Sequence, residues 1–364
     1  MNIITEFIKN KIMRVRRGQF YIPGESPPVN ITKILLNPRN ILIIPYNRMG
    51  TVLLATRVFK SFREHFSSAK ITVAVHNSWS VLIQKDPTID EVITFGDYIG
   101  NPHSKEFMNI ARKIAELDFD IAFFLSYQFD REMAYLTRLS AADLRISFKG
   151  SDELAYFNVE IVPSPHPRYE VERYLELLRT LGIKCSIRDY TMTMSESIRE
   201  KVRVRFLPAG MDEKKAHLIG FDLTKEIVGD PISRKNAEHI IKTLVSGLKA
   251  TVVVIFEPGK KELAASLKDV FGKDIILVED RPVSILAGMM SLCRFVVTHN
   301  TDMFQLSVAL KTPTIAILTK MEIIQWSPTE SDNLLHLERS NGDWPSSQKI
   351  LESAKRIVLQ TKKV

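Results

Sequence analysis

The polar turn His299–Asp302 has residue types that bind ligands and begin helices. It follows a short apolar run, Phe295–Val297, and precedes an apolar helix over residues 304–310. Thr, Asn and Asp side chains accept hydrogen bonds from the free N–H groups of a helix N-terminus, which supports this assignment. A Thr-Pro pair ends the helix, and Thr314–Leu318 then forms a buried strand, the last one that we expect.

This turn is predicted to lie where open α/β sheets bind their ligands. A turn between a parallel strand and the next helix lies at the carboxyl edge of the sheet, and the helix N-terminus there favours anions. Asn300, Thr301, Asp302 and Gln305 are therefore candidate ligand contacts. For Thr301, a helix N-cap without any ligand is an equal alternative. For Asp302, the alternative is a carboxylate that stabilises the helix dipole, because it would repel a phosphate.

Strands and helices alternate along the chain from residue 40 onward. In the first half, strands are expected at residues 40–46, 70–76, 91–95, 120–125 and 145–148. In the second half, further strands are expected at 216–221, 251–256 and 275–278, with helices at 236–248 and 348–361. This alternation predicts two doubly wound, Rossmann-like α/β domains with parallel sheets.

Composition and charge exclude several classes of protein. The chain has 50 basic and 42 acidic residues, a net charge of +8, which favours an anionic partner such as a nucleotide, a phospholipid surface or an acidic glycan. The basic residues are spread without an aromatic-rich cluster, so no nucleic acid partner is expected. No Gly-x-Gly-x-x-Gly motif follows either first strand, which argues against a dehydrogenase. No His–Cys cluster predicts a metal site, and no cofactor is expected.

The N-terminal residues and the cysteines bear on localisation. Cys185 and Cys293 lie far apart and fit a reducing compartment, so a cytoplasmic protein is expected. No apolar run approaches the roughly 18–20 residues of a membrane span, and no signal peptide is apparent. Residues 1–20 have an apolar face and five basic side chains, which predicts a helix lying on the inner face of the cytoplasmic membrane. The alternatives are a helix packed on the protein and a floppy basic arm. Residues 21–39 carry four prolines and are expected to be a linker.

Motifs in the first half resemble those of a known enzyme family. The loop after the first strand reads Arg-Met-Gly-Thr-Val over residues 48–52, and a Pro-x-Ile-Asp-Glu-Val-Ile element occupies residues 87–93. Residues 169–183 contain Arg-Tyr-Leu-x-Leu-Leu followed by Leu-Gly-Ile. These segments resemble the acceptor loop, a strand element and the interdomain helix of glycosyltransferase family 9, the heptosyltransferase-like enzymes of lipopolysaccharide synthesis.

The polar turn resembles the same family, with altered side chains. The family's turn reads Asp-Thr-Gly-Pro, with a His soon after it. Here Asn300 stands for the Asp, Thr301 matches, Asp302 stands for the Gly, and Gln305 stands for the His. The segment 319–326 resembles the family's loop that ends in Trp and Pro. The spacing of the motif is kept, but most of its polar side chains are different.

The resemblance covers roughly residues 40–330 and implies the glycosyltransferase B-type fold, in which two Rossmann-like domains face each other across a cleft. The expected division is a basic extension and linker over 1–39, an acceptor domain over 40–165, an interdomain helix over 166–189, a nucleotide-sugar domain over 190–345, and a helix over 346–364 that packs back towards the first domain.

The resemblance also implies how a donor is bound. In the family, a lysine in the loop after the second domain's first strand meets phosphate. Asp222, Thr224, Ser233 and Arg234 occupy this region here, and Arg234 or its neighbour Lys235 could replace the lysine. The alternative for each basic side chain is a solvated charge on a loop.

On the acceptor side, the resemblance implies contacts from Arg48 and Gly50. The residue after this glycine is the family's general base, an aspartate, and here it is Thr51, which cannot take a proton at neutral pH. Asp97 and His76 are candidates to replace it, together with Asp222 and His299. For His76, which ends a strand, the alternative is a hydrogen-bonded structural histidine.

Two functions remain open from the sequence. The first is a glycosyltransferase that moves a sugar from a nucleotide-activated donor, such as ADP-heptose, to a lipopolysaccharide or another cell-surface glycan or glycolipid acceptor. The second is a catalytically degenerate relative that binds a nucleotide, a glycan or a partner protein.

Overall fold

The structure, a computed structural model, describes residues 30–96, 104–150, 156–187, 192, 195–208, 211, 217–224, 232–279, 282–328, 331–340 and 343–360. The predicted helix at residues 1–20 and the candidate Asp97 lie outside these residues.

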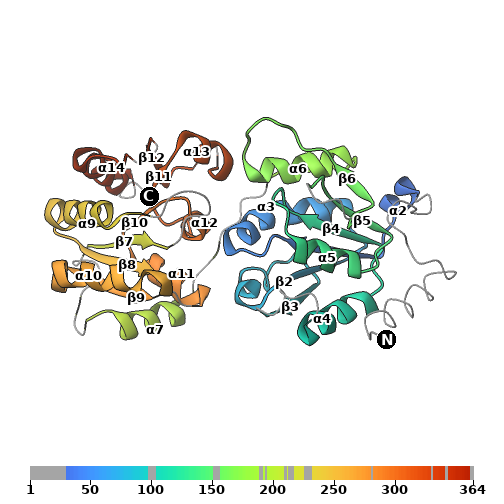
Figure 1. The fold of residues 1–364 in the computed structure, drawn as a ribbon, viewed down its shortest axis with the longest axis horizontal. Helices are drawn as coiled ribbons and strands as arrows, with labels where there is room; N and C mark the ends of the chain where they lie inside the picture. The colour runs from blue at the N-terminus through green and yellow to red at the C-terminus, as the bar shows by residue number, and fades with distance from the viewer. Residues whose placement is uncertain are drawn as a thin grey trace. The chain divides into compact units, whose positions relative to one another are not determined.

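The chain divides into two compact units (Figure 1). One comprises Met1–Asn47, Val58–Ser164 and Arg173–Ile187, and the other comprises Arg48–Arg57, Pro165–Glu172 and Arg188–Val364. The segment Arg48–Arg57 therefore belongs to the second unit, although the strand that ends at Pro45 belongs to the first.

A six-stranded parallel sheet forms the centre of the first unit, in the order β3-β2-β1-β4-β5-β6. Its strands are β1 (Asn40–Pro45), β2 (Lys70–His76), β3 (Glu91–Phe95), β4 (Ile121–Leu125), β5 (Leu144–Phe148) and β6 (Val159–Ile161). The helices of this part of the chain are α2 (Ile31–Leu36), α3 (Met49–His65), α4 (Lys105–Glu116), α5 (Arg131–Leu139) and α6 (Glu170–Thr180), with a 3-10 helix at Asn77–Leu82.

Both faces of this sheet are buried. Side chains alternate along a strand, so Ala122 and Phe124 of β4 join the core cluster that includes Phe107 of α4. Phe123 points to the opposite face, where its ring packs edge-on against the ring of Phe62 of α3, with 4.9 Å between the ring centroids. The continuous apolar strands of the sequence follow from this double burial.

The second unit repeats the architecture, with a parallel sheet in the order β12-β11-β10-β7-β8-β9. Its strands are β7 (Leu218–Leu223), β8 (Thr251–Phe256), β9 (Ile275–Glu279), β10 (Phe295–Thr298), β11 (Thr314–Leu318) and β12 (Leu334–Glu338). Its helices are α7 (Glu196–Phe206), α9 (Arg234–Leu248), α10 (Lys261–Phe271), α11 (Val283–Leu292), α12 (Asp302–Ala309), α13 (Lys320–Trp326) and α14 (Ser347–Gln360), with 3-10 turns at Pro258–Lys260 and Gly272–Asp274.

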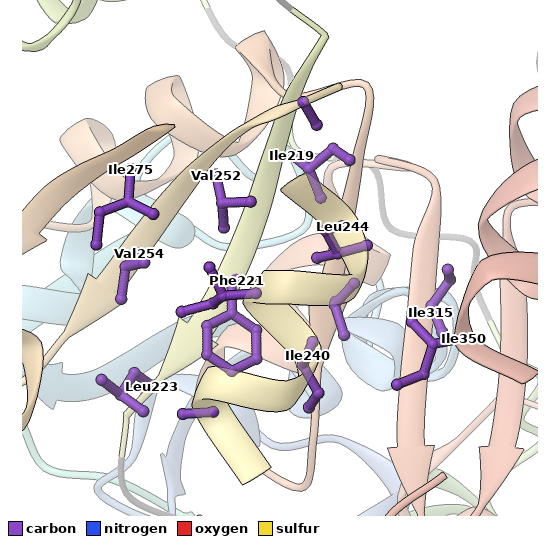
Figure 2. Close-up of a cluster of buried hydrophobic side chains, with 14 of the residues drawn as sticks. Ile219, Phe221, Leu223, Ile240, Leu244, Val252, Val254, Ile275, Ile315 and Ile350 are labelled. Carbon is purple, nitrogen blue, oxygen red and sulfur yellow. The ribbon is translucent and has the colours of Figure 1, made fainter. Parts of the chain in front are cut away.

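One face of this second sheet carries the core cluster shown in Figure 2. Phe221 of β7 lies among Val254 of β8 and Ile240 of α9, and Ile350 of α14 packs beside Ile315 of β11. Within this unit, α14 packs mainly against α9, β12 and β11. Because this face is filled by aliphatic side chains, the polar residues of β7 and β10 lie towards the other face and the strand ends.

The prediction of two Rossmann-like α/β domains is confirmed, with local differences. Strands β6 and β12 were not predicted; they are short edge strands whose residues are largely half-exposed or exposed. Such strands lack the apolar run that reveals a buried strand. The expected linker contains the short helix α2, and the expected loop 319–326 is helix α13. Among the described residues, no helix is long and apolar enough to cross a membrane.

The predicted helix 236–248 begins two residues earlier, at Arg234. Ser233 is its N-cap, and the Ser233 hydroxyl accepts a hydrogen bond from the backbone N–H of Asn236 at 3.2 Å. The cap moves Arg234 from the expected loop into the first helical turn.

Candidate active site

Most of the predicted donor residues lie where the strand order of the second sheet reverses. From β7 the sheet extends through β8 to β9, and from β10 it extends through β11 to β12. Loops that follow the two central strands of such a sheet run in opposite directions, and ligands of α/β proteins bind at this point. Asp222 lies near the end of β7, and Thr298 is the last residue of β10.

Asp222 ties these two strand ends together. Its Oδ1 accepts hydrogen bonds from the backbone N–H of Thr224 at 2.9 Å and from the Thr224 hydroxyl at 2.7 Å. Its Oδ2 accepts from the hydroxyl of Thr298 at 2.7 Å and from the hydroxyl of Thr301. The side chain is fully buried, so these four donors stabilise its charge away from water. Asp222 thus anchors the turn after β10.

Thr301 is the N-cap of α12. Its hydroxyl accepts a hydrogen bond from the backbone N–H of Phe304 at 3.4 Å and donates to Asp222. The residue is fully buried, and its hydroxyl proton is donated to the Asp222 carboxylate. The first backbone N–H groups of a helix have no acceptor within the helix. An anion at this end of α12 would therefore meet backbone N–H groups.

A second polar cluster lies beside the turn and centres on Glu322. The amide Nδ2 of Asn300 donates to Glu322 Oε1 at 3.1 Å, and the Arg339 guanidinium lies 3.3 Å from the same oxygen. Glu322 also closes a capping box at the start of α13, where its Oε2 accepts from the backbone N–H of Thr319 at 2.7 Å. The side chains of Glu322 and Arg339 are about nine-tenths buried. The Arg339 guanidinium lies 5.4 Å from the Trp344 ring.

Asp302, the first residue of α12, faces the start of α3 and the residue before it. Its Oδ1 accepts a hydrogen bond from the backbone N–H of Gly50 at 3.1 Å, and its Oδ2 lies 3.6 Å from Arg48 Nη2. A Cβ atom at Gly50 would lie 2.8 Å from Asp302 Oδ1 and 3.2 Å from the side chain of Gln305. A side chain at position 50 would therefore force the Asp302 carboxylate and Gln305 to shift.

The charge state of Asp302 reflects opposing influences. Burial raises the pKa of the Asp302 carboxyl above its usual value, and the nearby Asp222 charge acts in the same direction. Arg48 and the Gly50 N–H lower the pKa, but they do not reverse the shift. The side chain keeps 22% of its surface exposed. Asp302 is therefore a partly accessible carboxylate that is more basic than an ordinary aspartate.

Three other candidates, Thr51, Gln305 and Arg234, use their side chains in hydrogen bonds or ion pairs with other parts of the protein. Thr51 is the third residue of α3, and its hydroxyl donates to the Arg48 carbonyl at 2.8 Å. Gln305 donates through Nε2 to the Trp326 carbonyl at 2.8 Å. Arg234 is exposed and pairs with Glu238, with Nε 2.6 Å from Oε1.

His76 belongs to the first unit, where it ends β2. Its Nδ1 accepts a hydrogen bond from the backbone N–H of Ser78 at 3.2 Å, which caps the following 3-10 helix. Its ring also lies near Trp79 and Phe95.

Three residues of the site were missed in the sequence, namely Thr298, Glu322 and Arg339. The spacing of Thr319 and Glu322 is that of a capping box, a signal that could have identified the start of α13. Thr298 falls between the predicted strand, Phe295–Val297, and the polar turn, and Arg339 lies beyond a strand that was not predicted. In the described part of the chain, no three His, Cys, Asp or Glu side chains come together as metal ligands would.

Several solved structures share this architecture. A family 9 glycosyltransferase from Veillonella parvula matches with a TM-score of 0.74 and 15% identity, covering 90% of this chain and 99% of that chain. Escherichia coli ADP-heptose lipopolysaccharide heptosyltransferase II matches with a TM-score of 0.72 and 16% identity, over 89% and 99%. E. coli heptosyltransferase WaaC with ADP matches with a TM-score of 0.60 and 14% identity, over 89% and 100%.

The chain has the fold of the family 9 glycosyltransferases. The resemblance predicted from the loop at residues 48–52 and from the polar turn is confirmed at the level of the fold. No protein-family model matches the sequence, and no curated protein matches it. Because the identities to family 9 structures are only 14–16%, the assignment of an activity must come from the site.

Proposed function

We propose that the protein is a glycosyltransferase that moves a sugar from a nucleotide-activated donor to a glycan acceptor. The observation that carries the proposal is the anchored turn at the strand reversal of the second sheet. There Asp222 fixes the turn after β10, so that the N-terminus of α12 is held at the position where α/β sheets bind phosphorylated ligands. A nucleoside diphosphate is the anionic group that this helix end would hold.

The donor proposal assigns two roles to the predicted residues. Asp222, Thr224 and Thr301 bond one another and would act by fixing the turn. Exposed Ser233 and Arg234, at the start of α9, would act on the ligand itself. E. coli heptosyltransferase WaaC was solved with ADP and with ADP-2-deoxy-2-fluoro heptose, which supports ADP-heptose as the first donor to try.

Replacing Arg234 by alanine is expected to weaken nucleotide-sugar binding. A charge-assisted hydrogen bond to phosphate contributes roughly 1–3 kcal/mol, so the dissociation constant should rise by roughly 5- to 150-fold in a calorimetric titration. The matched control is Glu238→Gln, which removes the carboxylate that now pairs with Arg234. The control should bind as well as the wild type or better, and unchanged affinity in Arg234→Ala would remove this residue from the donor site.

The acceptor proposal rests on Arg48 and on the family resemblance. Arg48 keeps its position in the loop before α3, and its side chain is 29% exposed. A guanidinium there would bind an acidic group such as a phosphate or carboxylate of a lipopolysaccharide or other cell-surface glycan.

The transferase is tested by a screen with purified protein. ADP-, UDP- and GDP-activated sugars are combined with lipopolysaccharide-core acceptors, and transfer is detected by mass spectrometry of the product. Reproducible transfer by the wild type is the expected result. Tight nucleotide-sugar binding with no transfer to any acceptor would instead support a binding protein. The observation in favour of that alternative is Thr51, a residue without an ionisable group at the position of the family's base.

We also propose that residues 1–20 bring the protein to the inner face of the cytoplasmic membrane. The support is the amphipathic pattern with five basic side chains. The protein is expected to co-sediment with anionic liposomes, less so at high salt because the attraction is electrostatic. Deleting residues 1–20 should abolish this binding, and equal binding by the truncated protein would contradict the proposal.

A further inference from the structure

Three carboxylates lie at the ends of β7, β10 and β11, and they differ in what they can still bind. Asp222 is fully buried and accepts four hydrogen bonds from threonines. Glu322 is buried in its capping box and its ion pair with Arg339. Asp302 accepts one backbone hydrogen bond, from Gly50, and lies 3.6 Å from Arg48. A carboxylate has about four lone-pair positions, so Asp302 can accept a further hydrogen bond.

The surroundings of Asp302 hold the carboxylate in place. The backbone fixes it at the first position of α12, and the Gly50 N–H fixes its Oδ1. The first helical turn is also where a negative charge is favoured by the helix dipole. Gly50 is followed in the first turn of α3 by Thr51, whose hydroxyl is turned back onto the Arg48 carbonyl. The start of α3 therefore has no carboxylate of its own. Instead, α12 places the Asp302 carboxylate within hydrogen-bonding distance of the Gly50 backbone N–H.

We propose that Asp302 is the general base of the reaction and takes the proton from the acceptor hydroxyl. This role rests on the proposed glycosyl transfer. In the step, the acceptor oxygen bonds to the anomeric carbon of the sugar, and the bond between that carbon and the phosphate oxygen breaks. The electron pair of the broken bond leaves with the nucleoside diphosphate, and the hydroxyl proton passes to the Asp302 carboxylate.

The geometry also accounts for the neighbours of Asp302. Arg48 offsets the negative charge that Asp302 adds close to a diphosphate, so that the donor and the base can be present together. Glycine at position 50 leaves space for the carboxylate beside the backbone N–H in the first turn of α3. Arg48, Gly50 and Asp302 therefore form one site, in which each residue contributes to the position or the charge of the carboxylate.

The pH profile offers a readout that a purely structural residue would not change. The charged groups facing Asp302 are Arg48 from the loop before α3, which lowers its pKa, and Asp222 from β7, which raises it. Burial raises the pKa of Asp302 overall, so the carboxylate is protonated at a higher pH than an ordinary aspartate. As the pH is lowered, kcat should therefore begin to fall at a higher pH than it would with an ordinary carboxylate as the base.

The test compares Asp302→Asn, Asp302→Glu and the wild type. Asparagine keeps an oxygen that can accept from Gly50 but cannot take the proton. We expect kcat to fall by roughly 10²–10⁴-fold in Asp302→Asn, with loss of the acidic limb and nearly unchanged donor affinity. Asp302→Glu should recover part of the rate. The matched control is Glu262→Gln, which removes an exposed carboxylate from the first turn of α10 and should leave kcat unchanged.

The outcomes separate this role from the transferase itself. A wild type that transfers sugar together with an equally fast Asp302→Asn variant would overturn the role of Asp302 and leave the transferase standing. Loss of donor affinity as large as the loss of kcat would also overturn it, since Asp302 would then act in binding. A wild type that transfers no sugar would refute the transferase, and this role with it. Thermal melting of each variant identifies any loss that comes from unfolding.

Discussion

Replacing Asp222 by alanine is expected to destabilise the second unit by about 3–5 kcal/mol, because a buried hydrogen-bond network would lose its centre. The substitution leaves the hydroxyls of Thr298 and Thr301 and the backbone N–H of Thr224 without their acceptor. Each buried donor without a partner costs roughly 1–3 kcal/mol, and rotation of the hydroxyls recovers part of this.

Urea denaturation followed by tryptophan fluorescence measures this effect, because two of the three tryptophans, Trp326 and Trp344, belong to the second unit, and a Trp79→Phe background removes the one in the first unit. The transition of this unit should shift to lower urea concentration with little change in slope. Asp269→Ala, at an exposed position on α10, is the control for loss of a carboxylate. If Asp222→Ala were no less stable than this control, Asp222 would not be the anchor described above. Donor binding should fall with the anchor, because the turn that positions the α12 N-terminus would be released.

Replacing Glu322 by alanine is the second large effect that we expect. Arg339 would keep its positive charge in a site that is about nine-tenths buried, and Asn300 would lose its acceptor. Breaking one side of a buried ion pair costs roughly 3–5 kcal/mol, mostly because the remaining charge stays without a partner. The capping box of α13 would be lost at the same time, at a cost of roughly 1 kcal/mol.

A double-mutant cycle distinguishes the ion pair from the cap. Glu322→Leu combined with Arg339→Met removes both charges and should be much less destabilising than Glu322→Leu alone, because no buried charge is left over. Fluorescence of Trp344, which lies against Arg339, reports on the same region. Additive effects of the two substitutions would contradict a coupled buried pair.

The fold was predictable where a local pattern carries the information. The segment from Phe295 to Leu318 shows a buried strand, a capped helix and a second strand in order, and the structure has β10, α12 and β11 there. The edge strand β12 was not predictable in this way, since its residues alternate in exposure and include His336 and Glu338. The start of α9 was misplaced because a serine cap gives a weaker signal than the apolar residues that follow it.

The site was predictable as a set of residues but not as a set of roles. The motif resemblance pointed to Asp222 and Thr301 as ligand contacts. In the structure these two residues, 79 positions apart in the chain, are hydrogen-bonded to each other and hold the turn itself. The contact between Gly50 and Asp302 spans 252 residues. No periodicity or spacing encodes such a pairing, because it depends on how separate segments pack. From the sequence, a carboxylate at position 302 suggested repulsion of a phosphate or stabilisation of the helix dipole, and no contact with Gly50.

A crystal structure with a bound nucleotide sugar would locate the donor diphosphate and the Asp302 carboxylate together. We predict that the diphosphate lies at the N-terminus of α12, accepting hydrogen bonds from its first backbone N–H groups, and that Asp302 remains beside Gly50, on the side from which an acceptor reaches the anomeric carbon. A donor bound elsewhere on the second unit, or an anomeric carbon that an acceptor hydroxyl could reach only from a side remote from Asp302, would contradict it.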